Sequence, residues 1–561
     1  MHAQASGAFA IGLDFGTESV RAVVVDTGSG ETRGTAIHRY EHGVIDARLP
    51  GSGTPLGAEW ALQHPGDWMN GLERATRQAV GESGVDPRAI AGIGIDFTAS
   101  TVLPTDASGT PLCERKDLAA NPHAWPKLWK HHAAQPEADR VNDAASRRAE
   151  PWLARYGGRI SSEWLLPKAW QVAEEAPEVY DAAAHFIEGA DWVTWQLTGV
   201  CARNACGAGF KGLWHKREGY PSRAFLSTLD PRLGGLYEER AQGEVVAPGS
   251  RLGPLTTEWA GRLGLHPDTP IAAPTIDAHA AVLGSGIAGP GPLFLIMGTS
   301  TCHLAMADRE VLVPGIAGVV EDGIAPGYYG YEAGQSAVGD IFAWFVTHGV
   351  PEAYAEEAKA GSRSLHDLLS ERAARLAPGA SGLLALDWWN GNRSTLMNAD
   401  LSGLLVGMRL STKPEHIYRA LVEATAFGTR VIVDAFAANG LPVSGLVAGG
   451  GLTQNSHVMQ VYADVCGRDL TIAGSPQASA LGAAMLGALA AGRGRGGHDT
   501  LLDAVNAMTP PPARVYRPHT AYQATYEELY ACYRELYDLF GRERAIMKTL
   551  KRLRDAAAPL A

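Results

Sequence analysis

Two stretches of this chain resemble each other: residues 11–26 read IGLDFGTESVRAVVVD, and residues 293–308 read LFLIMGTSTCHLAMAD. Each has an apolar run, a Gly-Thr pair and a second apolar or alternating run, and in each an Asp follows ten positions after the turn glycine. The pattern predicts a β-hairpin whose tight turn uses Gly16 or Gly298, because glycine adopts a positive φ at little cost. Any two hairpins share some of these features, so a true repeat needs further evidence.

A second, weaker correspondence supports the repeat. Residues 90–98 and 443–451 are each a short apolar strand that runs into a turn after a helical stretch. Two such features in the same order predict two domains of related fold. The Gly/Pro-rich segment 284–292 (GSGIAGPGP) is the expected join or hinge between them.

The length of 561 residues is too great for one hydrophobic core. We predict an N-terminal domain at residues 8–288, a C-terminal domain at 289–510 and a C-terminal helical extension at 511–561. Within the extension, residues 523–552 carry apolar side chains at helical spacing among many charges, which predicts one long amphipathic helix.

The composition excludes several classes of protein. Apolar residues make up 46% and charged residues 19%, which is typical of a globular protein, and the net charge of −12 argues against nucleic acid as the main partner. No secretory signal is visible at the N-terminus, and the longest apolar stretches, such as 481–492, are shorter than the ~20 residues that span a bilayer. The six cysteines show no zinc or disulfide pattern, which favours free buried thiols. We therefore expect a cytoplasmic protein.

The two Gly-Thr turns differ in one chemical respect. Asp14 precedes Gly16-Thr17, whereas Ile296 occupies the equivalent place before Gly298-Thr299. A phosphate chain held between two such turns receives N–H and hydroxyl donors from both sides, and only one side needs a carboxylate for Mg²⁺ or its water shell. An isolated Asp-x-Gly-Thr is more often a turn at a strand end, so the pairing of the turns carries the inference of a metal–nucleotide clamp.

Other nucleotide-binding signatures are weaker. The chain has no G-x-x-x-x-G-K-[ST] loop, and the G-x-G-x-x-G match at residues 207–212 lacks the buried strand before it and the helix after it that a dinucleotide site needs. Gly449-Gly450-Gly451 follows an apolar strand and precedes Asn455 and a helical segment, residues 458–465. A bare glycine turn of this kind suits a flat ligand such as adenine, although a triple glycine is as often a plain loop.

Taken together, these motifs resemble the FGGY carbohydrate kinases over residues 9–490. The ordered set is Asp14-Phe-Gly-Thr17, Gly94-Ile-Asp-Phe-Thr98, Asp191-Trp-Val with Leu197-Thr-Gly199, Asp277, Gly298-Thr-Ser300, Glu332-Ala-Gly-Gln-Ser336 and Gly449-Gly-Gly451. One departure is Leu165, which precedes Leu166-Pro-Lys168-Ala-Trp170 where the family usually has a small or hydroxyl residue. It puts in doubt a transfer of specificity from xylulose or glycerol kinases, not the kinase activity.

The resemblance implies an α/β fold of two actin-like (ribonuclease H-like) domains with an interdomain cleft. It also implies ATP- and Mg²⁺-dependent phosphorylation of a ketopentose. L-ribulose is favoured over D-ribulose or D-xylulose as the substrate, and its phosphorylation would be a step of L-arabinose catabolism. By resemblance Asp277 is the catalytic base, and the substrate-binding set is Ala99, Trp129, Lys130, Lys211, Asp277 and Glu332. The nucleotide would contact Gly16, Thr17, Gly298, Thr299, Ser300, Gly449, Gly450, Gly451 and Asn455, and Asp14 would hold the metal.

Some alternatives stay open. Asp277 is also suited to cap the following helix, and Lys130 is equally compatible with a surface helix over residues 127–131. We take His279 as structural and leave Arg393 outside the site, as a domain-contact residue. Rival functions are an inert sugar- or nucleotide-sensing module and an ATPase scaffold without a sugar pocket. The sequence does not fix the oligomeric state, and a homodimer is one option.

Overall fold

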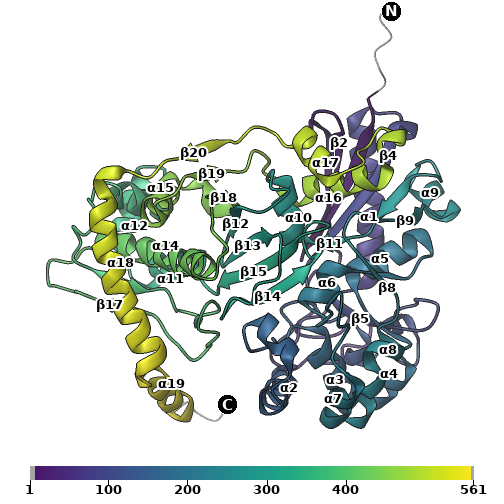
Figure 1. The fold of residues 1–561 in the computed structure, drawn as a ribbon, viewed down its shortest axis with the longest axis horizontal. Coiled ribbons are helices and arrows are strands. Elements are labelled where there is room, and N and C mark those ends of the chain that lie inside the picture. The colour runs from purple at the N-terminus through teal and green to yellow at the C-terminus, as the bar shows by residue number, and fades with distance from the viewer. Residues whose placement is uncertain (1–6, 558–561) are drawn as a thin grey trace, which may run out of the picture.

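The computed structural model describes residues 7–557 (Figure 1). Its first large sheet has the order β3-β2-β1-β4-β10-β9, with β11 also paired to β4. The strands are β1 (Phe9–Phe15), β2 (Ser19–Asp26), β3 (Thr32–Arg39), β4 (Ile90–Phe97), β9 (Arg251–Pro254), β10 (Pro270–Ala272) and β11 (Thr275–Ile276). Strand β1 pairs antiparallel with β2 and parallel with β4, so the predicted hairpin over residues 11–26 is confirmed.

The second large sheet repeats this arrangement. Its order is β14-β15-β13-β12-β18-β19-β20, and β12 pairs antiparallel with β13 and parallel with β18. The strands are β12 (Pro292–Met297), β13 (Thr301–Ala307), β14 (Gly318–Glu321), β15 (Tyr329–Gln335), β18 (Gly445–Gly449), β19 (Leu470–Ile472) and β20 (Arg514–Tyr516). The predicted second hairpin and the repeated strand at 443–451 are both confirmed. The order of five strands, β3-β2-β1-β4-β10, matches β15-β13-β12-β18-β19.

Two helices rich in small residues lie between the sheets, α10 (Asp277–Gly284) and α16 (Ala478–Ala491) (Figure 1). Helix α16 packs directly on the backbone of β1 and β4: a Cβ added to Gly94 would lie 1.8 Å from the carbonyl oxygen of Ala483. A Cβ on Gly482 would lie 1.9 Å from the Ala280 carbonyl oxygen of α10. Glycine at these positions is required because helix and strand backbones touch. The opposite face of the first sheet is covered by α1 (Pro65–Ser83), which contacts β2 and β3.

The chain crosses between the two sheets near its end. After α15 (Ser456–Cys466), helices α16 and α17 (Leu501–Met508) lie beside the first sheet, and β20 then returns to the edge of the second (Figure 1). One hydrophobic cluster accordingly joins Val23 of the first sheet, Phe294 of the second sheet and Met485 of α16. The domain limits 8–288, 289–510 and 511–561 stay predictions.

Further elements surround this frame. Between β4 and β10 lie β5 (Val102–Thr105), α2 (Gln135–Arg147), α3 (Leu165–Glu175), α4 (Pro177–Ala182), β6 (His185–Glu188), α5 (Gly189–Thr198), β7 (Ala202–Asn204), α6 (Ala205–Phe210), α7 (Arg223–Leu229), α8 (Leu236–Arg240), β8 (Glu244–Val246) and α9 (Thr257–Leu263). Side chains of β5, α2, α3, α4, β6, α7 and α8 form a separate core there, whereas α5 and α9 pack into the core of the first sheet. The second sheet is flanked by α11 (Gly339–His348), α12 (Glu352–Ala360), α13 (Leu365–Ala373), β16 (Leu384–Leu386), β17 (Leu404–Val406) and α14 (Pro414–Ala438). The prediction that no buried strand precedes residues 207–212 is wrong, since β7 is buried; residues 207–210 nevertheless lie inside α6, not in a strand-to-helix turn.

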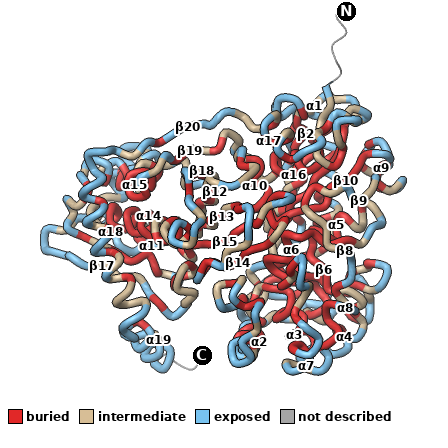
Figure 2. The backbone as a smooth tube through the Cα atoms, viewed as in Figure 1, coloured by how far each residue is buried: buried red, intermediate tan, exposed pale blue. Residues whose placement is uncertain are grey.

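The predicted single helix over 523–552 is interrupted. Helix α18 (Gln523–Asp538) and helix α19 (Ile546–Ala557) are separated by a π-helical turn at residues 539–543 and an extended Arg544. The backbone of Gly541 packs closely on Leu396, because a Cβ there would lie 2.5 Å from the Leu396 Cδ1 atom. Four tyrosines of α18 are buried, whereas α19 buries only Met547 among its described side chains and stays exposed (Figure 2).

Two smaller expectations can be compared with the structure. No helix within residues 7–557 combines the length and apolarity that crossing a bilayer requires. All six cysteines lie in this range and are free, but only Cys113, Cys206 and Cys466 are buried and Cys532 is exposed, so the prediction of buried thiols is right for half of them.

Candidate active site

The first Gly-Thr turn joins β1 to β2. The Gly16 N–H donates to the Ser19 carbonyl oxygen at 2.9 Å, and the buried Gln63 side chain donates to the Thr17 carbonyl oxygen at 2.8 Å. Gly16 and Gly298 both lack a positive φ, so the predicted reason for these glycines is wrong. A Cβ on either would approach only one backbone oxygen, at 3.4 Å and 3.8 Å. Their bare Cα atoms instead leave room above each turn.

Three carboxyl groups gather where the strands of the first sheet end. The parallel register places Asp14 beside Asp96, and Asp96 beside Thr275, two residues before Asp277. Burial raises the pKa of Asp14, which Arg21 opposes with a hydrogen bond of 3.2 Å from Nη1 to Asp14 Oδ2. Burial raises the pKa of Asp96 well above its usual range, and the charges of Asp14 and Asp277 raise it further.

Asp277 is the first residue of α10. Its Oδ1 accepts from the Ala278 N–H at 2.6 Å, and the helix cap is Ile276, so Asp277 is not the capping residue that the sequence also allowed. Burial, and next the negative charge of Asp14, raise its pKa to about 7. A carboxyl group with a pKa near neutrality is suited to accept a proton at physiological pH.

The second turn, residues 298–300, joins β12 to β13 and carries no carboxylate. The Val338 N–H donates to the Thr299 carbonyl oxygen at 2.7 Å, and the Gly339 N–H donates to the Gly298 carbonyl oxygen at 3.0 Å. Helix α11 therefore begins directly behind this turn and fixes its position.

Glycines 449–451 end β18 and lead into α15, as predicted. Gly450 has a φ of +93°, and a Cβ there would lie 2.5 Å from the Met297 carbonyl oxygen, so this position requires glycine. Asn455 caps α15, its Oδ1 accepting from the His457 and Val458 N–H groups at 3.1 and 3.2 Å. Gly451 and Asn455 line a cavity of about 270 Å³ together with Gly339, Phe342 and Tyr418.

An ion-pair network built on the buried Lys211 and Glu332 lies close enough to Asp277 for its charges to act on that carboxyl group. Lys211, at the C-terminal end of α6, donates to both Glu332 oxygens at 3.0 and 2.9 Å, and Arg393 donates to Glu332 Oε1 at 2.5 Å. Burial alone would raise the pKa of Glu332, but Lys211 and Arg393 outweigh it and lower the value to about 2. His279 Nε2 lies 3.8 Å from Glu332 Oε2, and burial lowers the pKa of His279 to about 4.

The remaining predicted sugar residues come from two loops. Ala99, after β4, packs against a small cluster that contains Phe210 and Ile276, so it lies between the segments of Lys211 and Asp277. Trp129 is 39% exposed and its Nε1 donates to the Thr17 hydroxyl at 3.1 Å. Lys130 is half-buried and has no hydrogen bond or ion pair from its side chain within the described residues. The alternative of a surface helix over 127–131 is wrong, because this segment is a bridge residue followed by a turn.

The sequence reasoning missed three residues of this site. Asp96 stood in the quoted motif but was given no role, and Arg393 was left out although it pairs with Glu332. Lys168 lies in the segment 165–170, which departs from the family pattern at Leu165. It is 1% exposed and donates to the carbonyl oxygens of Ser100, Lys127 and Leu128 at 2.6, 3.2 and 2.8 Å. It thereby ties the loop of Ala99 to the loop of Trp129.

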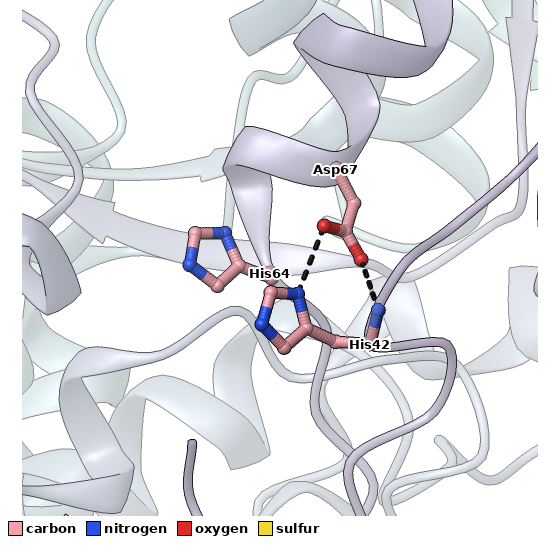
Figure 3. Close-up of side chains that lie close together, drawn as sticks. All are labelled: His42, His64 and Asp67. Carbon is pink, nitrogen blue, oxygen red and sulfur yellow. Dashed lines mark hydrogen bonds and ion pairs between the residues drawn. The ribbon is translucent and has the colours of Figure 1, made fainter. Parts of the chain in front are cut away.

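A second group of side chains has the composition of a metal site but not its geometry. His42, His64 and Asp67 lie together beside the start of α1 (Figure 3). Asp67 accepts from the His42 backbone N–H and pairs with its Nδ1, both at 2.9 Å, and the two imidazole rings stack 4.6 Å apart at an angle of 14°. A metal ion lies near the plane of each imidazole that ligates it, and two nearly parallel stacked rings share no such point. Asp67 and His42 form a hydrogen-bonded pair, and His64 caps α1 by accepting from the Gly66 N–H at 3.0 Å.

The carboxyl cluster, by contrast, fits a divalent metal ion. Mg²⁺ prefers oxygen ligands, and Asp14, Asp96 and Asp277 supply only oxygen. Both Asp96 oxygens are buried without a hydrogen-bond partner among the described residues. Unpaired buried charge of this kind is costly unless a cation neutralises it.

Comparison with known families agrees with this arrangement. The N-terminal domain of the FGGY family of carbohydrate kinases matches residues 9–284, and the C-terminal domain of the same family matches residues 293–491. The chain belongs to the FGGY family of carbohydrate kinases. The expected two-domain, actin-like α/β fold is thereby confirmed.

Individual relatives are similar over nearly the whole chain. A ribulokinase of Bacillus licheniformis is 52% identical over 538 residues, covering 96% of this chain and 98% of the relative, and a ribulokinase of Mycolicibacterium smegmatis is 47% identical, covering 98% and 97%. Among solved structures, a xylulose kinase from Rhodospirillum rubrum superposes with a TM-score of 0.78 at 22% identity, covering 97% of this chain and all of that one. The structural likeness shows the fold.

Proposed function

We propose that this chain transfers the γ-phosphoryl group of ATP to L-ribulose, giving L-ribulose 5-phosphate. Two findings support the choice of sugar: the relatives named ribulokinase match over nearly the full length, and the buried Lys211–Glu332 pair lies next to Asp277. The observation that carries the proposal is Asp277 itself, a half-buried carboxyl group whose pKa is raised to about 7 and which feels the charges of Asp14, Lys211 and Glu332. In L-arabinose catabolism such a kinase would act on the ketopentose formed by isomerisation.

In this mechanism Asp277 accepts the proton of the sugar's terminal hydroxyl as that oxygen attacks the phosphoryl group. Lys211 and Glu332, with Ala99, Trp129 and Lys130, bind the sugar, since directional donors and acceptors are needed around its hydroxyl and carbonyl groups. Arg393 holds Glu332 ionised, as its hydrogen bond of 2.5 Å requires.

The nucleotide is bound mainly by the second sheet. Backbone N–H and hydroxyl groups of Gly16, Thr17, Gly298, Thr299 and Ser300 would donate to the phosphate oxygens from both sides. Adenine would lie against Gly449, Gly450 and Gly451 beside Asn455, where the cavity of about 270 Å³ lies. Asp14 would hold Mg²⁺, which supplies charge neutralisation for the phosphates when bound.

The two-lobed arrangement supports closure about residues 284–292 around the substrates, which would exclude water. Exclusion matters because water in the place of the sugar hydroxyl would be phosphorylated instead, and ATP would be hydrolysed. ATP and a ketopentose are the proposed small-molecule partners, and the cytoplasm, where both are available, is the proposed location. The homodimer stays a prediction.

A panel of ketoses tests the proposed function. ADP release coupled to added sugar is measured with L-ribulose, D-ribulose, D-xylulose and no sugar. The proposal expects the highest kcat/KM with L-ribulose and little release without sugar. A preference for D-ribulose or D-xylulose would reassign the substrate, and equal release with and without sugar would favour an ATPase.

A further inference from the structure

Asp96 is a buried carboxylate to which no hydrogen-bond donor of the described residues is directed; the side chain within its reach is another carboxyl group, that of Asp14. It lies near the end of β4, a strand whose eight residues are all buried, and it is 0% exposed. Both of its carboxyl oxygens lack a hydrogen-bond partner within residues 7–557. Buried polar atoms are almost always paired, so a carboxylate with two free oxygens indicates a missing ligand.

The side chain of Asp96 is directed toward the proposed reaction site. It shares a register position with Asp14 on one neighbouring strand and with Thr275 on the other, and residues in register on adjacent strands project to the same face of a sheet. Asp277 follows Thr275 by two residues, and the charges of Asp14 and Asp277 are both felt at Asp96. The three carboxyl groups therefore converge.

The local cations are bound to other carboxylates, and Arg21 acts on Asp96 only through its charge. Arg21 donates to Asp14, and Lys211 is bound to both oxygens of Glu332. Neither makes a hydrogen bond or an ion pair with Asp96 in the part of the chain that the structure describes. Three converging carboxyl groups with one engaged arginine are suited to a divalent cation.

The repeated sheet shows that the fold does not need an acid here. Ile296, the counterpart of Asp14, is in register with Gly449, which therefore occupies the place of Asp96. The first residue of α16, the counterpart of α10, is Ala478. The same architecture thus forms with no carboxylate at any of the three places.

We propose that Asp96 is a second protein ligand, direct or through water, of the divalent cation that accompanies ATP, acting beside Asp14. This assignment rests on the proposed function, because it takes the metal–nucleotide complex as the occupant of the cluster. Asp96 is thus a metal-binding residue, whereas Asp277 is the residue that receives the proton.

The test measures metal binding without any sugar. Mn²⁺ replaces Mg²⁺, and free Mn²⁺ is followed by electron paramagnetic resonance while it is titrated into the full chain with saturating ADP. Asp96→Asn, which keeps the shape and removes the charge, is expected to weaken Mn²⁺ binding by roughly 10- to 100-fold, the range seen when supporting ligands of metal sites are lost. Mn²⁺ affinity within twofold of the original chain would overturn the proposal.

Asp191→Asn is the matched control. Asp191 is also buried at 1% exposure with one unpartnered oxygen, but its other oxygen accepts from Asn204 at 2.9 and 2.7 Å. This variant is expected to bind Mn²⁺ like the original chain. Thermal unfolding checks both variants, and if Asp96→Asn does not fold, Asp96→Ser is titrated in its place with the same two outcomes.

The outcomes separate this proposal from the proposed function. If ribulose is not the substrate, the ketose panel shows it while the Mn²⁺ titration still distinguishes Asp96→Asn from the control. If Asp96 binds no metal, the titration shows it while sugar phosphorylation by the original chain is unaffected.

Discussion

The ends of the two central sheets share a backbone plan and differ in charge. In the first sheet, β1, β4 and α10 present Asp14, Asp96 and Asp277; in the second, β12, β18 and α16 present Ile296, Gly449 and Ala478. Both sheets nevertheless keep the Gly-Thr turn after the first strand. The repeated fold therefore has the Gly-Thr turn twice and the carboxylates once.

The proposed function gives the two sheets separate tasks. The acidic end suits the cation and the reacting hydroxyl, whose charges must be balanced or moved. The end without carboxylates suits the anionic phosphates and the flat adenine, which a carboxylate would repel. Each of the following experiments changes one side of this comparison.

Among the variants that compare equivalent places of the two sheets, the largest expected effect comes from the matched pair Asp14→Asn and Ile296→Val. Loss of the Asp14 charge is expected to lower kcat by about 10²-fold or more, since metal ligands and preformed charges contribute on this scale. Ile296→Val keeps an apolar side chain at the equivalent place, so kcat should stay within about threefold. Steady-state rates at saturating ATP measure both, and equal losses would remove the asymmetry between the sheets.

The second prediction concerns pH. The pKa of Asp277 is raised to about 7 by burial and by Asp14, and a base must be ionised to act. We expect kcat/KM for the sugar to fall about tenfold per pH unit below this value and to level off above it. A flat kcat/KM profile from pH 5 to 8 would contradict the base assignment.

The same shift has a consequence for stability. Between its ordinary value of 3.8 and about 7, the folded chain keeps a proton on Asp277 that the unfolded chain has lost, so Asp277 makes the folded state less stable as pH rises through this window. Asp277→Asn should therefore unfold a few degrees higher than the original chain at pH 8 and not at pH 4. Thermal unfolding of the variant and the original chain at pH 8 and pH 4 measures this difference.

The third prediction separates two kinds of glycine. Gly450→Ala forces a side chain onto a positive φ and against the Met297 carbonyl oxygen, so it should cost about 1–3 kcal/mol of unfolding free energy. Gly16→Ala and Gly298→Ala meet no such contact, so their unfolding temperatures should change little while the KM for ATP rises. Thermal unfolding and ATP titrations distinguish them; loss of stability in all three would mean that the turns serve folding alone.

The smallest effect is expected for Trp129→Phe. The change removes the hydrogen bond of 3.1 Å to the Thr17 hydroxyl, a contact worth roughly 1 kcal/mol, so the KM for the sugar should rise by about two- to fivefold. Trp344→Phe, an exposed tryptophan of α11 without such a bond, should leave KM unchanged. If both variants change the KM alike, the hydrogen bond between Trp129 and the first Gly-Thr turn has no role in sugar binding.

Much of the frame could be predicted from sequence because its signals are local. The two hairpins show as apolar runs around Gly-Thr pairs, and the glycine turn at 449–451 lies between a short strand and a helix. Contacts between distant segments could not be predicted in this way. Arg393 and Glu332 are 61 residues apart, and no spacing rule indicates that they pair.

The place of Asp96 in the carboxyl cluster was not predicted for a different reason. Every residue of β4 is buried, so polar–apolar alternation does not reveal which face Asp96 occupies. The crossing of α16 to the first sheet depends on close contact between glycines of both elements, which only the folded structure shows. The close contact of Gly541, within the helix break at 539–543, with Leu396 is likewise visible only in the folded structure.

The most direct measurement uses Asp277→Asn in two assays on the same preparation. Isothermal titration gives the Kd for ATP, and coupled ADP release gives kcat with L-ribulose. If one sheet end holds the nucleotide and the other moves the proton, the Kd stays within about threefold while kcat falls by about 10²- to 10⁴-fold, the usual contribution of a general base. Unchanged turnover would contradict the account.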